Sequence, residues 1–153
     1  MIEINERFDV PAAAPRTVWD LLSDPQAVVG CVPGATLGEE HEDGSFDGSL
    51  TVKFGPARVT FKARIELAID DAAMTGRVTS RGKDNQGGTR FNATMGFSVV
   101  ENTELPGTTV LIKGENEITG KLSGIVESGA KIVIKRMSSE FAENLAARVG
   151  GAK

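Results

Sequence analysis

The last part of the chain, residues 122–149, has the spacing of one long amphipathic helix, and almost everything before it alternates as short strands do. A lone long helix that follows a run of strands can bury its apolar side on the open face of their sheet. The apolar residues of this helix form a stripe that recurs every seven or four residues, at Val126, Val133, Met137, Phe141, Leu145 and Val149. Ile125 and Ile132 are expected to widen this stripe.

The strands that precede this helix show apolar residues on one parity and polar residues on the other. The first strand is predicted over residues 2–10, with Glu6 as the exception on its apolar parity. Pro15 and Pro25 are expected to open two short helices, residues 15–23 and 25–30. About six antiparallel strands result, and this order indicates an α+β fold. The clearest later strands are residues 46–54, 57–69, 74–79, 91–99 and 110–118.

The bulk numbers are those of an ordinary globular protein, and we expect a single domain over residues 1–153. A net charge of −4 argues against non-specific binding of nucleic acid. No apolar run is long enough to span a membrane, and the N-terminus lacks the pattern of a signal peptide. A single Cys31 fits a reducing compartment, so the protein is predicted to be cytoplasmic.

The side chains that usually carry catalysis are scarce. The chain has one His and one Cys, too few for a His/Cys metal site. A nucleophilic pair would require Cys31 to meet His41, which sits in a polar stretch typical of an exposed turn. Glu66, Glu115 and Glu117 all fall on the outward parity of their strands. We therefore predict no metal site and no catalytic residues.

The inward parity of the strands mixes aromatic residues with small ones such as Ala93 and Gly114. Small residues under a long helix leave volume unfilled unless larger neighbours close over it. Both outcomes are open at this point: the Phe and Met side chains fill the interior, as close packing requires, or a ligand-sized cavity remains.

Several motifs together resemble the G-subunit family of carbon monoxide dehydrogenase, which belongs to the START/Bet v 1-like (SRPBCC) helix-grip superfamily. The resemblance covers almost the whole chain, and its most specific parts are the Cys31–Gly34 turn and the Gly55–Pro56 hairpin. This sequence has Ala63 and Arg64 where many relatives carry a glycine. The other matching motifs are Val18-Trp19, Leu22, Asp24-Pro25, Val52-Lys53-Phe54 and Phe61-Lys62.

The resemblance implies a curved seven-stranded antiparallel sheet wrapped around the C-terminal helix, with a hydrophobic tunnel between them. It also implies an accessory role beside a molybdenum hydroxylase such as carbon monoxide dehydrogenase, with a respiratory quinone of the menaquinone type as the carried molecule. No covalent cofactor is implied. Some relatives continue past the helix into a membrane-associating tail, so a peripheral position at the inner face of the plasma membrane is a further expectation.

The leading hypothesis is a non-catalytic carrier of a lipophilic molecule. Asn116 would hydrogen-bond a ligand carbonyl or, alternatively, be satisfied by backbone groups. The Gly55–Pro56 hairpin would form the rim together with Val32. The predicted lining comprises Val32, Phe54, Val59, Phe61, Phe91, Met95, Phe97, Asn116, Val133, Met137 and Phe141.

Two alternatives remain. The first is an assembly or membrane-recruitment factor for the dehydrogenase that carries no ligand. It would use the small basic group Lys131, Lys135 and Arg136 on the helix exterior, which is otherwise a solvated helix face. The second is a cyclase-like or hydrolase-like enzyme, which would need an inward acid or base.

Overall fold

The computed structural model describes residues 2–11, 13–54, 56–85, 88–102, 104, 107–121 and 123–151. Leu122 and Gly55, which belong to the predicted helix start and the predicted rim hairpin, lie outside these residues. In chain order the elements are β1 (Ile2–Pro11), α1 (Pro15–Leu22), α2 (Pro25–Cys31), β2 (Ala35–Glu40), β3 (Phe46–Phe54), β4 (Ala57–Asp70), β5 (Thr75–Asp84), β6 (Thr89–Glu101), β7 (Gly107–Gly120) and α3 (Ser123–Gly151).

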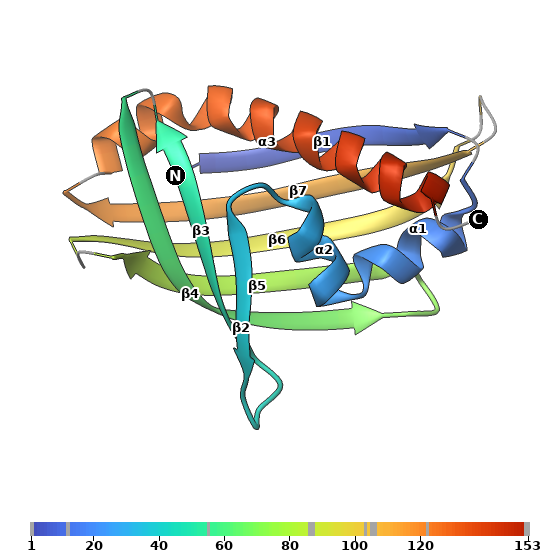
Figure 1. Ribbon diagram of the computed structural model, residues 1–153, viewed down its shortest axis with the longest axis horizontal. Helices are drawn as coiled ribbons and strands as arrows, with labels where there is room; N and C mark the ends of the chain where they lie inside the picture. The colour runs from blue at the N-terminus through green and yellow to red at the C-terminus, as the bar shows by residue number, and fades with distance from the viewer. Residues whose placement is uncertain are drawn as a thin grey trace.

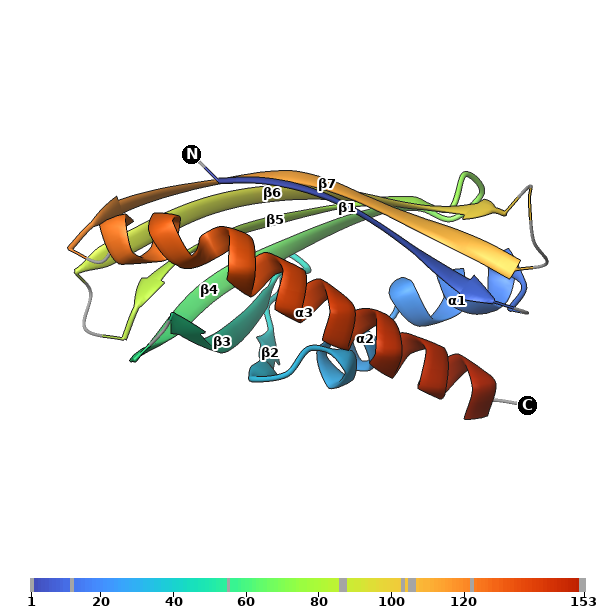
Figure 2. The same ribbon diagram turned by 90° about the horizontal axis from the view of Figure 1, so that it is seen from above.

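The strands form one seven-stranded antiparallel sheet in the order β1-β7-β6-β5-β4-β3-β2. The sheet curves over α3, which lies along its concave side and contacts β1, β3 and β7 (Figures 1 and 2). This confirms the predicted α+β helix-grip fold. The sequence did not locate β2, because only Ala35 and Leu37 on that strand are half-buried and its alternation is therefore short.

Two short helices lie at the end of the sheet nearest the C-terminus of α3 (Figure 2). Pro15 and Pro25 each stand in the first turn, where a missing backbone N–H costs nothing. The Asp24 carboxylate accepts from Gln26 N at 3.1 Å and caps α2. The following turn is type II, as the Pro33-Gly34 pair predicts, because Pro fixes φ and Gly accepts a positive φ. Ala35 N donates to Val32 O at 3.2 Å, and Gly34 has a φ of +82°.

Helix α3 faces the sheet with one side only. Val126, Val133, Leu145 and Val149 are buried on that side. The expectation that Ile125 and Ile132 widen the apolar stripe is wrong, since these side chains are 45% and 74% exposed. Each stands one residue before a buried valine, and one residue is a turn of about 100° around the helix, which carries both isoleucines to the solvent side.

The buried core is divided into two clusters at opposite ends of α3. The first, which we call the Trp19 cluster, joins α1 and the C-terminal half of α3 to β1, β6 and β7. The Trp19 ring nitrogen Nε1 donates to Asp71 Oδ1 at 2.7 Å, which fixes α1 to the β4–β5 turn. Its buried members are Val10, Val18, Trp19, Leu22, Val99, Val110, Leu145 and Val149.

The second cluster, the Phe61 cluster, lies at the other end, where the N-terminal half of α3 meets β3, β4 and β7. Phe61 and Phe91 pack edge to face with ring centroids 5.4 Å apart. Its buried members are Val52, Phe54, Val59, Phe61, Ile118, Val126 and Val133. The helix is therefore held at its two ends by separate groups of apolar contacts.

Leu145→Ala should lower the free energy of unfolding by about 2–5 kcal/mol, because Leu145 is fully buried in the Trp19 cluster and its truncation leaves a cavity. Ile132→Ala on the solvent side of the same helix should change it by no more than about 0.5 kcal/mol. Urea denaturation followed by circular dichroism measures both. Equal losses in the two variants would contradict the assignment of the helix faces.

Candidate functional site

Between the two clusters lies a set of inward side chains that belong to neither. We call it the central band, and all its members are only half-buried although they point towards α3. Side chains in a close-packed interior are in contact on every side and lose almost all their exposure. The concave face is therefore incompletely covered at the middle of the sheet. The band comprises Ile4, Leu67, Val78, Ser80, Ala93, Met95, Gly114 and Asn116.

The pairing register arranges the band in two adjacent rows across the sheet. One row runs from Ile4 through Gly114, Met95 and Val78 to Leu67. In this row Gly114 leaves a gap in the inward surface. A Cβ at Gly114 would lie 2.6 Å from the carbonyl oxygen of Thr94, so the close approach of β6 keeps this position small.

The second row places two polar groups on either side of an alanine. Ala93 pairs with Asn116 on one neighbouring strand and with Ser80 on the other. Asn116 Oδ1 is buried and has no hydrogen-bond partner within the described part of the chain. The interpretation in which backbone groups satisfy this amide is therefore wrong for its oxygen. Leaving such a group unpaired costs about 1–3 kcal/mol.

The predicted lining residues are distributed over these three regions. Met95 and Asn116 lie in the central band, and Val32 is half-buried at the end of α2. Phe97 and Phe141 pack at the Trp19 cluster, with ring centroids 5.7 Å from Trp19 and 5.8 Å from Phe8, respectively. The remaining six belong to the Phe61 cluster or pack against it: Phe54, Val59, Phe61, Phe91, Val133 and Met137.

Several residues of the band were not predicted from the sequence. Ser80 stands on the same parity as Gly76 and Val78, so continuing the alternation along β5 would have found it. Leu67 and Ile4 stand on the apolar parity of their strands, which predicts that they face inward. Parity does not say which inward residues lie at the partly exposed middle of the sheet, so neither was assigned to a site.

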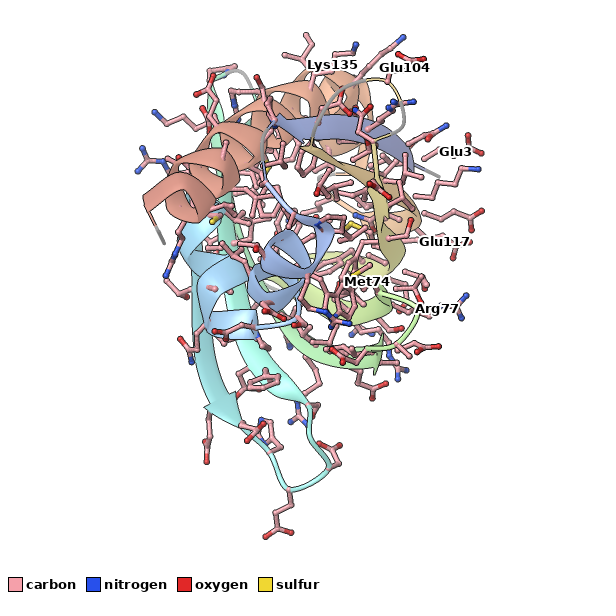
Figure 3. The ribbon with its side chains drawn as sticks, turned by 90° about the vertical axis from the view of Figure 1, so that its right-hand side faces the viewer. Glu3, Met74, Arg77, Glu104, Glu117 and Lys135 are labelled. Atoms are coloured by element: carbon pink, nitrogen blue, oxygen red, sulfur yellow. The ribbon has the colours of Figure 1, made fainter. Side chains whose placement is uncertain are left out.

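Carboxylates lie on both faces of the sheet. Glu66, Glu115 and Glu117 are exposed on the outward face, as their parity predicts, and Figure 3 shows Glu117 pointing away from α3. Glu6 is half-buried on the inward face of β1, where it pairs with Ile112. Within the described residues the Glu6 carboxylate has no ion pair and no hydrogen bond.

The one His and the one Cys are engaged separately. His41 Nε2 bonds Asp47 Oδ1 at 2.8 Å beside the β2–β3 turn, and this hydrogen bond holds the pKa of the Asp47 carboxyl below its usual value. Cys31 is buried at the end of α2, where its carbonyl oxygen accepts from Asn144 Nδ2 at 3.0 Å. Among the described residues there is no Cys31–His41 hydrogen bond and no group of His, Cys, Asp and Glu able to hold a metal ion.

None of the helices in the described part of the chain combines the length and the apolar character needed to cross a bilayer.

Comparison with known proteins extends over almost the whole chain. The family model for the G subunit of carbon monoxide dehydrogenase (CoxG) matches residues 7–150. A comparison with curated proteins gives no match.

Solved structures share the fold at low sequence identity. A conserved protein from Geobacillus kaustophilus has a TM-score of 0.82 at 18% identity, with 99% of this chain and 97% of that chain covered. A START superfamily protein from Mycobacterium smegmatis has a TM-score of 0.59 at 17% identity, with 99% of each chain covered. The Zhui aromatase/cyclase from Streptomyces sp. R1128 has a TM-score of 0.62 at 16% identity, with 97% and 93% covered. These similarities show the START/Bet v 1-like fold.

Asn116→Leu should leave the free energy of unfolding unchanged or raise it by about 1 kcal/mol, because it removes a buried amide oxygen that has no hydrogen-bond partner among the described residues. Thr108→Val is the matched control. The Thr108 hydroxyl is buried and donates to Ala13 O at 2.7 Å, so this change should be destabilising. Urea denaturation of ligand-free protein measures both. A loss for Asn116→Leu as large as that for Thr108→Val would mean that the amide is satisfied within the protein.

Proposed function

Because the chain belongs to the CoxG family of carbon monoxide dehydrogenase, we propose that it is a non-catalytic accessory protein of a molybdenum hydroxylase such as carbon monoxide dehydrogenase. It holds a lipophilic molecule between the sheet and α3, and passes that molecule between the membrane and the enzyme. The protein works in the cytoplasm and meets the inner face of the plasma membrane transiently.

One observation carries the proposal: the central band is half-buried, mainly apolar, and contains the unpartnered Oδ1 of Asn116. A ligand that fills the band removes apolar surface from water, at about 25 cal/mol per Å². A polar group on that ligand can pair with the amide. Ligand sites of this kind are apolar with a few placed polar groups.

A respiratory quinone has the chemistry that this site would select. Its isoprenoid tail is apolar, and its ring carries two oxygens. The Asn116 amide can donate from Nδ2 to a quinone carbonyl, and it can accept at Oδ1 from the hydroxyl of the reduced quinol. The site therefore suits both redox forms, as a carrier requires. The aromatic pair Phe61–Phe91 at one end of the band offers an apolar wall for the ring or tail.

Glu6 favours a second candidate function, that of an enzyme. It is an inward carboxylate at the side of the band, and one of the structural neighbours is an aromatase/cyclase. An acid or base in an apolar cavity is the minimum that proton-transfer chemistry needs. We place this second, because the described residues contain no metal-binding group. Asp84, another inward carboxylate, pairs with Phe61 outside the band and accepts a hydrogen bond from Gly88 N.

Met137→Trp should weaken binding of a short-tailed menaquinone at least about tenfold, because Met137 lies on the sheet-facing side of α3 beside the Phe61 cluster and a larger ring fills the space above the band. Ile132→Trp, on the solvent side of the same helix, should bind as the wild type does. Native mass spectrometry and quinone titration measure occupancy.

The proposal is wrong if wild-type protein purified from its own host carries no lipophile and also binds no quinone on titration. If neither Met137→Trp nor Asn116→Leu changes the affinity for quinone, the quinone does not bind at the central band. Glu6→Gln separates the two functions, since a carrier should keep its affinity and an enzyme should lose turnover.

A further inference from the structure

The outward face of the sheet carries a row of cations directly opposite one another. Lys62 on β4 pairs with Lys83 on β5, and Lys83 pairs with Arg90 on β6. In the next row Arg64 pairs with Arg81. All five side chains are exposed. We call Lys62, Lys83, Arg90 and Arg81 the cationic groove.

This arrangement is unfavourable for folding. Like charges directly opposite on neighbouring strands are destabilising. Arg64 forms an ion pair with Asp47, whose Oδ1 lies 3.4 Å from Arg64 Nε, and this pair offsets the repulsion between Arg64 and Arg81. Within the described part of the chain, no member of the cationic groove forms an ion pair. The cations gather here although the whole chain has a net charge of −4.

The same residues border an open hollow of about 620 Å³ on the sheet surface. Asn92, Glu117 and Thr119 complete its polar rim, and Glu117 is the one acidic residue among the described residues that line it. Figure 3 shows Glu117 on the side of the sheet turned away from α3. The hollow therefore lies on the face opposite the central band, and a partner bound there leaves the interior free.

We propose that the cationic groove docks an acidic surface patch of a protein partner. Adjacent strands are about 4.8 Å apart, so Lys62, Lys83 and Arg90 span about 10 Å, which suits several carboxylates better than one phosphate. Complementary charge of this kind raises association rates and selects the partner. This partner assignment rests on the proposed function, which names a molybdenum-containing dehydrogenase as the protein that is met.

The surroundings of the groove favour a protein over a membrane or a nucleic acid. The exposed large apolar side chains of the described chain are Ile69, Val100, Leu111, Ile125 and Ile132, and none of them lines the hollow. A membrane-binding surface combines cations with inserted apolar residues. Binding of single-stranded nucleic acid uses exposed aromatic rings for base stacking, and Phe91, which belongs to the hollow, pairs with Phe61 in the core.

The test compares two triple variants of equal charge change in the full chain. Lys62→Gln, Lys83→Gln and Arg90→Gln neutralise the groove, whereas Lys131→Gln, Lys135→Gln and Arg136→Gln neutralise the exposed basic group on α3. Figure 3 shows Lys135 on the helix side of the molecule, away from the groove. The probe is the carbon monoxide dehydrogenase of the same organism, immobilised and titrated at low and at physiological salt.

We expect the groove variant to bind the dehydrogenase at least about tenfold more weakly at low salt, mainly through slower association, and the α3 variant to bind as the wild type does. Glu117→Gln should tighten binding. The groove variant should be at least as stable to urea as the wild type, because repulsion between its cations is removed. Equal weakening of both triple variants, or no binding by the wild type, would overturn the proposal.

Two further probes test whether the groove binds an anionic membrane or a small anion instead of an acidic protein surface. Vesicles of phosphatidylcholine with about one-third phosphatidylglycerol test a membrane, and inorganic phosphate tests a small anion. Groove-dependent binding to either one, without groove-dependent binding to the dehydrogenase, overturns an acidic protein partner. Quinone binding is measured in the same variants. If a groove variant no longer binds the dehydrogenase but still binds quinone, the docking site is lost while the proposed carrier function remains. The two proposals can therefore fail separately.

Discussion

The structure depends on how α3 is held against the concave side of the sheet. The helix makes its own backbone hydrogen bonds, so it needs apolar contact from the sheet rather than polar pairing. That contact is concentrated at two places, the Trp19 cluster and the Phe61 cluster. Because both ends are fixed, the side chains between them can stay half-buried without loss of the overall arrangement.

The two-residue alternation of the strands lets one sheet serve two purposes. Inward positions of β1 and β4–β7 form the central band, and the intervening outward positions of β4–β6 carry the cationic groove. A ligand in the band and a partner on the groove would therefore be separated by one layer of backbone. Both features cost stability, one through an unpaired amide oxygen and the other through repulsion between cations. Binding of the proposed ligand and the proposed protein partner would remove both costs.

Much of the fold could be predicted from local patterns. The spacing from Val126 to Val149 located α3, and strand parity placed Glu66, Glu115 and Glu117 outward. The turn at Pro33 and Gly34 was predicted from backbone preferences alone. The sequence-based prediction was wrong at the edge of the apolar face of α3. Ile125 and Ile132 were assigned to that face, since hydropathy does not say how wide a face of the helix the sheet covers.

Periodicity and residue type predicted the order of the elements except β2, and the inward and outward faces of the strands they located. The sequence also has too few His and Cys residues for a His/Cys metal site. These properties are local or compositional. Which inward residues are covered depends instead on how the helix and sheet pack together. Phe97 and Phe141 pack against the Trp19 cluster, while Met95, Ser80 and Asn116 lie at the partly exposed middle of the sheet. Strand register likewise brings Lys62, Lys83 and Arg90 side by side, since residues far apart in the chain become neighbours only when the strands pair.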